Sequence, residues 1–135
     1  MNGKKACAVA IATVVFVLGV STIAGARGGG SIPTAIVFHD ALDTANPDIL
    51  RFVGVVNSPK PKCENHRQLR FAARPFPSNA PFSPRGSAET NRDGEWSKLL
   101  NIQGLPEFRI KAPAKKFGRP GHRRKCAADT IFLEP

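Results

Sequence analysis

Short apolar and alternating runs, separated by proline- and glycine-containing turns, characterise most of the chain. Residues 67–71 and 107–111 alternate polar and apolar side chains, a pattern typical of strands with one buried face. Residues 50–56 are apolar at almost every position, which favours a central strand. Residues 32–38 and 126–133 are rich in β-branched and aromatic types and are predicted as the first and last strands.

A tight turn is predicted at residues 90–96, which end in the only tryptophan of the sequence. Asp93-Gly94 supplies residues that tolerate positive φ, so we expect a hairpin whose arms are residues 86–90 and 95–100. With residues 107–111, these arms would make three consecutive antiparallel strands.

Proline and glycine predict the irregular segments. Residues 39–48 are broken by Pro47 and are expected to be a loop. Residues 74–85 contain four prolines, which exclude a helix or a ladder strand through them and predict an extended loop. Residues 115–125 contain two glycines and a proline and are expected to lack regular structure.

The predicted fold is therefore all-β, a small antiparallel β-sandwich of short strands. There is no internal repeat, heptad or long amphipathic helix. Gly54, in the middle of a strand, is expected to pack against Trp96. The predicted core consists of Phe52, Val55, Leu69, Phe71, Trp96, Phe108, Ile110 and Phe132. Phe132 follows from alternation counted from Cys126, but the other face of that strand holds Ile131 and Leu133, so its register stays open.

The first 26 residues have the composition of a secretory signal peptide. Lys4 and Lys5 precede an apolar run at residues 6–23, and small residues follow it. We expect cleavage after Ala26, a flexible mature end at residues 27–31, a β-sandwich domain at 32–135 and a secreted product. The alternative is an uncleaved signal that anchors the protein in a membrane.

Removal of the signal would take away Cys7 and leave Cys63 and Cys126. An even pair in an exported chain predicts one disulfide. The alternative is a reactive thiol or a metal pair, but neither cysteine lies in a Cys-x-x-Cys or Cys-His pattern.

The mature chain is strongly basic. All 10 acids follow residue 26, and so do all of the 20 lysines and arginines except Lys4 and Lys5, which leaves a formal charge of 18 − 10 = +8. Such a charge favours anionic partners: phosphate-rich cell-wall polymers, lipid headgroups, acidic polysaccharides or nucleic acid. The candidate anion-binding residues are Lys115, Lys116, Arg119, Arg123, Arg124 and Lys125. The alternative is a loop whose charges serve only solubility.

Catalytic and metal chemistry find little support in the sequence. The three histidines, His39, His66 and His122, lie in separate predicted loops, and no serine has a nucleophile-elbow context. A metal site from His39, Asp40 and Asp43 lacks ligand spacing. We therefore predict no enzyme activity, no cofactor and no metal.

Three motifs follow one another along the chain: Phe52-Val53-Gly54-Val55-Val56, Thr90 with Asp93-Gly94-Glu95-Trp96, and Gly104 followed by Phe108-Arg109-Ile110. In this order they resemble the carboxypeptidase regulatory-like, or transthyretin-like, β-sandwich domains of exported bacterial proteins. The resemblance implies a Greek-key sandwich of about seven strands, immunoglobulin-like or transthyretin-like, and the composition of residues 1–26 predicts a signal-peptide helix before it. The resemblance also implies a disulfide between Cys63 and Cys126 and no catalytic residue.

The function expected from these features is that of a non-catalytic secreted module with a structural or binding role, which contacts anionic cell-surface polymers through its basic loop. One alternative is a cationic toxin or antimicrobial protein that acts on membranes. Another is a small hydrolase. The sequence predicts no small-molecule substrate and does not indicate the oligomeric state.

Overall fold

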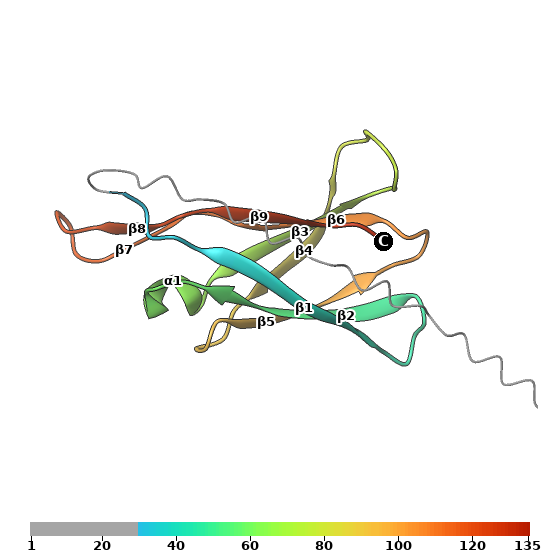
Figure 1. Cartoon of the computed structure of the whole chain (residues 1–135), viewed down its shortest axis with the longest axis horizontal. Helices are drawn as coiled ribbons and strands as arrows, with labels where there is room; N and C mark the ends of the chain where they lie inside the picture. The colour runs from blue at the N-terminus through green and yellow to red at the C-terminus, as the bar shows by residue number, and fades with distance from the viewer. Residues whose placement is uncertain (1–29) are drawn as a thin grey trace, which may run out of the picture.

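Two antiparallel β-sheets face each other in the computed structural model, which describes residues 30–135 (Figure 1). The first sheet has the order β1-β2-β5 and the second the order β4-β3-β6-β9, while β7 and β8 form a separate two-stranded hairpin. The elements are β1 (Ala35–Asp43), β2 (Ile49–Asn57), α1 (Pro61–Glu64), β3 (Gln68–Arg74), β4 (Ser83–Glu89), β5 (Glu95–Asn101), β6 (Glu107–Ala112), β7 (Lys115–Phe117), β8 (Arg124–Cys126) and β9 (Asp129–Leu133). The all-β prediction is confirmed, with seven strands in the two facing sheets.

The connections between the sheets follow a Greek key. The chain crosses from the first sheet to the second after β2, returns after β4 and crosses again after β5. This arrangement places β1, β2 and β5 opposite β3, β6 and β9, as in immunoglobulin constant-type sandwiches, except that β4 pairs with β3. The prediction of three consecutive antiparallel strands is therefore wrong, because β5 pairs with β2 while β4 and β6 flank β3.

The turn at residues 90–96 connects the two sheets instead of closing a hairpin. Thr90 is buried and stays with the second sheet, because its backbone N–H donates to the Arg67 carbonyl at 2.9 Å and its Oγ1 accepts from the Arg67 N–H at 2.7 Å. The Asn91 side-chain oxygen accepts from the N–H groups of Asp93 and Glu95, both at 2.9 Å. Local turn chemistry was identified correctly, but it did not reveal which sheet each arm joins.

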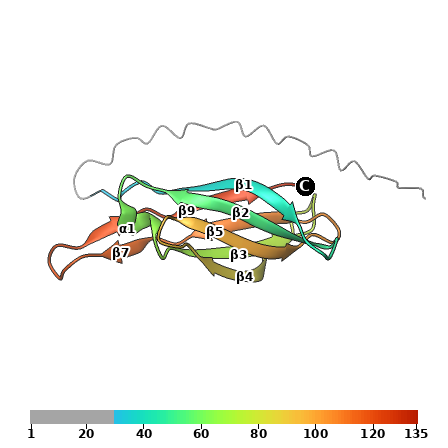
Figure 2. The same ribbon diagram turned by 90° about the horizontal axis from the view of Figure 1, so that it is seen from below.

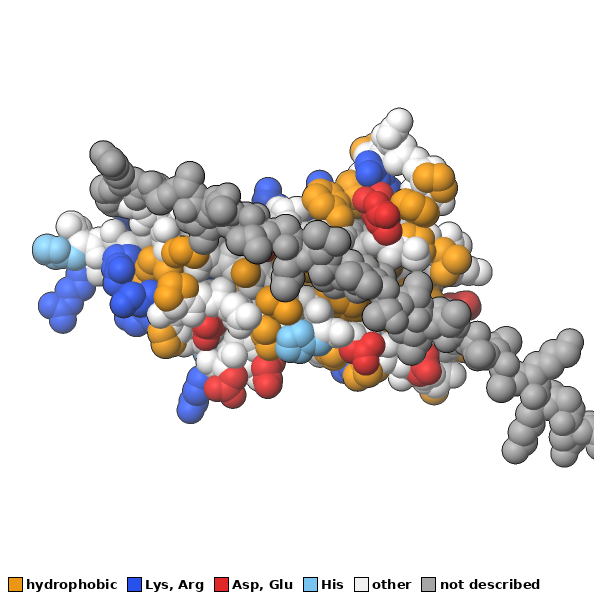
Figure 3. All heavy atoms as spheres, viewed as in Figure 1, with side chains coloured by type: hydrophobic (Ala, Val, Ile, Leu, Met, Phe, Trp, Pro, Cys, Tyr) orange, Lys and Arg blue, Asp and Glu red, His pale blue; other side chains and the backbone are white. Residues whose placement is uncertain are grey.

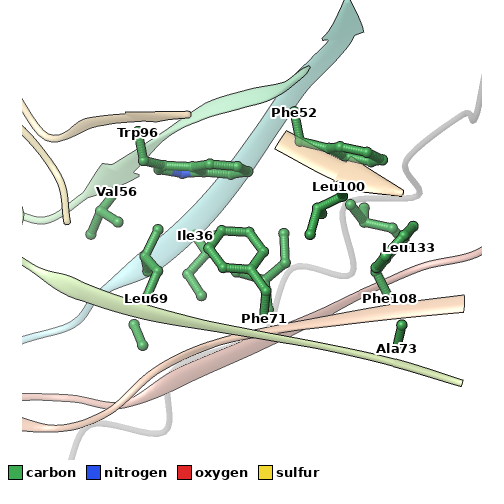
Figure 4. Close-up of a cluster of buried hydrophobic side chains, with 12 residues drawn as sticks. Ile36, Phe52, Val56, Leu69, Phe71, Ala73, Trp96, Leu100, Phe108 and Leu133 are labelled. Carbon is green, nitrogen blue, oxygen red and sulfur yellow. The ribbon is translucent and has the colours of Figure 1, made fainter. Parts of the chain in front are cut away.

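The core lies between the sheets, where side chains from both layers meet (Figure 4). The rings of Phe71 and Trp96 have centroids 5.7 Å apart, and those of Phe52 and Phe108 are 5.3 Å apart. Six of the eight predicted core residues are buried, as expected: Phe52, Leu69, Phe71, Trp96, Phe108 and Ile110.

Two predicted core residues lie elsewhere. Val55 is half-buried outside the core cluster, and its neighbour Val56 fills the core instead. Phe132 is 52% exposed, because β9 directs Ile131 and Leu133 inward. The pattern counted from Cys126 fails here since residues 127 and 128 interrupt the chain between β8 and β9.

Three predicted loops contain strand. Residues 39–43 extend β1, whose pairing with β2 shifts register between Phe38 and Asp40. Ser83 and Pro84 begin β4, an edge strand, where a missing N–H is tolerated. Residues 115–125 include the paired strands β7 and β8.

Gly54 packs directly against Trp96, as predicted. The two residues are partners across β2 and β5. A Cβ at position 54 would lie 2.1 Å from the Val37 carbonyl oxygen and 2.6 Å from Trp96 Cζ2. Only glycine therefore allows the indole to lie over the centre of the first sheet.

The predicted signal peptide, residues 1–26, lies outside the described part of the chain. Within residues 30–135, no helix has the length and apolar character needed to cross a bilayer.

Gly54→Ala is expected to lower the free energy of unfolding by at least about 3 kcal/mol, because the added methyl group would displace the Trp96 ring and a strand carbonyl. Urea denaturation followed by Trp96 fluorescence would measure this loss. Gly104→Ala is the control, since its Cβ would meet nothing within 4 Å and its positive φ should cost about 1 kcal/mol. Equal losses in the two variants would contradict the packing argument.

Candidate anion-binding hairpin

The strands β7 and β8 continue the ribbon of β6 and β9 past one end of the sandwich (Figures 1 and 2). Lys115 pairs with Cys126, Lys116 with Lys125 and Phe117 with Arg124. At the tip, Gly118 and Gly121 have φ values of +104° and +83°. These glycines allow residues 118–123 to turn sharply and to hold Arg119 and Arg123 at the end of the projection.

A disulfide fixes the base of the hairpin to the sandwich. The Cα atoms of Cys63 and Cys126 are 5.5 Å apart, and both cysteines are fully buried, so the predicted disulfide is confirmed. Ile32 lies beside β8, where its N–H donates to the Lys125 carbonyl at 2.7 Å and its carbonyl accepts from the Ala127 N–H at 2.8 Å. Ile32, Cys63 and Cys126 form a small second core on which Phe117 packs.

Arg67 is buried at the same junction, with 1% of its surface exposed. One guanidinium nitrogen, Nη2, donates to the carbonyl oxygens of Pro113 at 2.8 Å and Ala127 at 2.7 Å, which flank the two hairpin strands. The other, Nη1, donates to the Cys63 carbonyl at 3.1 Å and to Thr34 Oγ1 at 3.2 Å. A single planar group therefore positions the hairpin, the disulfide and the start of β1.

Burial lowers the pKa of the Arg67 guanidinium, and the nearby carboxylate of Asp129 opposes that shift. Asp129 is itself held in place, since its Oδ2 accepts from the Ile36 N–H at 2.7 Å. This role was not predicted because a charged residue is expected at the surface, although the position of Arg67 in the run 67–71 puts it on the same face as Leu69 and Phe71.

Five of the six predicted anion-binding cations are exposed on the hairpin, namely Lys116, Arg119, Arg123, Arg124 and Lys125. Figure 3 shows their end of the molecule, where blue side chains and one histidine gather. Lys116 and Lys125 are direct cross-strand neighbours, an arrangement of like charges that is destabilising.

No carboxylate compensates these charges. Residues 108–128 contain no Asp or Glu, and the only two ion pairs among residues 30–135 are His66–Glu89 and Arg74–Glu107. The hairpin is therefore an uncompensated cationic surface, which an anion with several charges would stabilise.

The sixth cation, Lys115, faces the sandwich. Its Nζ donates to the carbonyls of Lys62 and Asn65, both at 3.2 Å. Burial, followed by the positive charge of Arg67, lowers the pKa of Lys115. Lys62 takes its place near the hairpin, with its Nζ 5.6 Å from the centre of the Phe117 ring. No local sequence pattern groups Lys62 with residues more than fifty positions away.

The hydrolase alternative can be tested against a surface hollow that contains two of the three histidines. This hollow, of about 720 Å³, is lined by His39, His66, Glu89 and Ser97 among others. His66 Nδ1 lies 2.9 Å from Glu89 Oε1, and both side chains are at least half exposed. Within residues 30–135, no serine hydroxyl hydrogen-bonds to a histidine, the contact that would activate a nucleophile.

His39, Asp40 and Asp43 all lie on β1. Across the described chain, no group of three or more His, Cys, Asp or Glu side chains is arranged to hold a metal ion. The residues of the hollow and of β1 thus supply exposed polar groups without a defined catalytic or metal-binding geometry.

Comparisons with models of protein families, with curated proteins and with solved structures found no significant match.

Replacing Arg67 by Met is expected to lower the free energy of unfolding by about 3 kcal/mol or more, because three carbonyl groups at the junction would lose their donor. Urea denaturation would measure the loss. Arg70→Met, an exposed position on the same strand, is the control and should change stability by less than about 0.5 kcal/mol. These hydrogen bonds of Arg67 are called the Arg67 clamp below. A loss below about 1 kcal/mol for Arg67→Met would show that the clamp does not stabilise the junction.

The double variant Cys63→Ser, Cys126→Ser is expected to lose about 4 kcal/mol of stability, since the disulfide spans 63 positions and restricts the unfolded chain. Thermal and urea unfolding would measure it. The wild-type protein with its disulfide reduced should lose a similar amount. A double variant as stable as the oxidised protein would show that the bond contributes nothing.

Proposed function

We propose that this protein is a non-catalytic secreted β-sandwich module that binds an anionic cell-surface polymer through the β7–β8 hairpin. The observation that carries the proposal is the concentration of five exposed, uncompensated cations on one projection. Retaining such a cluster has an electrostatic cost in the free protein, which a polyanion would remove.

The way the hairpin is held supports a binding role. The disulfide, the Arg67 clamp and the Ile32 bridge fix its base, so the cations project from a rigid frame. A fixed frame lowers the conformational entropy lost on binding. Arginines at the tip suit phosphate, sulfate or carboxylate groups because each guanidinium can donate two parallel hydrogen bonds.

A secreted location is part of the proposal. It is supported by the disulfide, which persists in oxidising compartments, and by the composition of residues 1–26. Membership of the carboxypeptidase regulatory-like group is also proposed, with the Greek-key connections and the Gly54–Trp96 contact in its support.

The test is polyanion binding as a function of salt, with long-chain inorganic polyphosphate as the probe. Replacing Arg119, Arg123 and Arg124 by Gln should weaken binding and reduce the slope of log K against log salt by about 2, because each engaged cation releases roughly 0.7 of a counterion from a single-stranded polyanion.

The matched control replaces Arg51, Arg85 and Arg92 by Gln, which removes the same charge from exposed positions outside the hairpin. This control should reduce the slope by much less. Equal effects of the two triple variants would mean that net charge, and not the hairpin, drives binding. Leakage from anionic vesicles without polyphosphate binding would favour the membrane-active alternative instead.

A further inference from the structure

The outer face of the second sheet carries a group of arginines and aromatic rings that the hairpin does not include. Leu69, Phe71 and Ala73 of β3 point into the core, so Arg70 and Arg74 lie on the opposite face. The same alternation places Arg109 and Lys111 of β6 and Phe132 of β9 on that face. Arg74, Phe82, Arg109 and Phe132 are called the sheet platform below.

The members of the sheet platform hold one another in place. The guanidinium carbons of Arg74 and Arg109 lie 4.4 Å and 4.9 Å from the centre of the Phe82 ring. The Phe82 and Phe132 rings have centroids 5.9 Å apart. Cation–π contacts therefore fix two planar guanidinium groups on the Phe82 ring, and the Phe132 ring beside it remains 52% exposed.

The platform has an excess of positive charge. Arg74 is neutralised by Glu107, with Nε 2.8 Å from Oε2. Arg109 has no carboxylate partner among the described residues. Next to it, Arg70 and Lys111 are direct cross-strand partners of like charge. The face therefore favours an anionic ligand, as the hairpin does, but through different side chains.

The chemistry of the platform favours flat aromatic groups over sugars. Sugar hydroxyls need acceptors as well as donors, and arginine and lysine side chains only donate. Two carboxylates lie on this face, and both already have partners: Glu107 is 6% exposed and bound to Arg74, and Glu89, at the other end of β3, is bound to His66 and Gln68. Phenylalanine rings and guanidinium planes both stack on nucleobases, and the charged groups bind phosphate.

We propose that the sheet platform, with Arg70 and Lys111, binds single-stranded nucleic acid, with a base stacked on Phe132 and phosphates held by Arg109 and Lys111. This site shares no residue with the hairpin, so the proposal stands whether or not the hairpin binds a cell-surface polymer.

The experiment compares two probes with the same number of phosphates, an oligothymidylate and an abasic oligonucleotide, in fluorescence anisotropy at fixed salt. The wild-type protein should bind oligothymidylate about tenfold more tightly, because stacking of one base on an aromatic side chain typically contributes about this much. Phe132→Ala should abolish the preference and leave the affinity for the abasic probe unchanged. Arg109→Lys, which keeps the charge but removes the plane, should weaken binding of oligothymidylate more than that of the abasic probe.

Two control variants test whether the preference depends on the platform, and not on any exposed apolar side chain or on net charge. Leu99→Ala removes a side chain of matched exposure, 50%, on the other sheet and should preserve the preference. The hairpin variant with Arg119, Arg123 and Arg124 replaced by Gln should lower the affinity for both probes equally, or for neither. The ratio of the two affinities should therefore stay the same.

Equal binding of the two probes by the wild-type protein would overturn the proposal. An unchanged preference for oligothymidylate over the abasic probe in Phe132→Ala would also overturn it. Phe132-dependent binding of polygalacturonate or of anionic vesicles, without a preference for bases, would assign the platform to another ligand and overturn the nucleic-acid proposal. Polyphosphate has no bases that could stack on Phe132. Its binding therefore tests the hairpin proposal alone, and the two proposals can fail separately.

Discussion

The buried guanidinium of Arg67 hydrogen-bonds to four separate parts of the chain. It donates to oxygens at the start of β1, in α1, before β7 and after β8, segments that lie up to 93 positions apart along the chain. Apolar packing alone would leave those carbonyls unpaired inside the protein, because the loops that carry them do not belong to either sheet ladder. A planar group with five donors satisfies them together, and lysine could not.

This buried cation also explains why the disulfide and the hairpin form one unit. The Cys63 carbonyl accepts from Arg67, and the Cys63 sulfur is bonded to that of Cys126, whose neighbour Ala127 accepts from the same guanidinium. The junction is thus closed both covalently and by hydrogen bonds. It lies at the end of the sandwich away from the connection between β1 and β2, and the core between the sheets forms separately around Trp96.

Local sequence patterns identified most strands and most of the core, and they failed where tertiary context decides. Alternation placed Leu69, Phe71, Phe108 and Ile110 correctly because one buried face repeats every second residue. It misplaced Phe132, because two residues interrupt the strand before it. Strand partners were not predictable from residues 90–96, since a turn of that composition serves a hairpin or a crossing between sheets equally well.

The residues of the candidate sites were likewise predictable only where they are close together in the sequence. A run of cations in sequence is visible without a structure, so all five exposed cations of the hairpin are among the predicted candidates. The inward turn of Lys115 and the approach of Lys62 depend on α1, which only the fold brings close. The sheet platform draws on three strands and a loop, and its residues are separated by up to 58 positions from Arg74 to Phe132, so no local pattern reveals it.

Two of the four edge strands of the sheets, β1 and β4, are irregular. The pairing of β1 with β2 shifts between Phe38 and Asp40, and β4 contains Pro84, a register shift against β3 and Gly86 at a φ of +97°. An unpaired strand edge attracts further strands from other chains, but proline and bulges interrupt the row of donors and acceptors that such growth requires. The edges at β1 and β4 are therefore poorly suited to backbone pairing with a neighbouring molecule, so any growth of the sheets by added strands would have to start at β5 or β9.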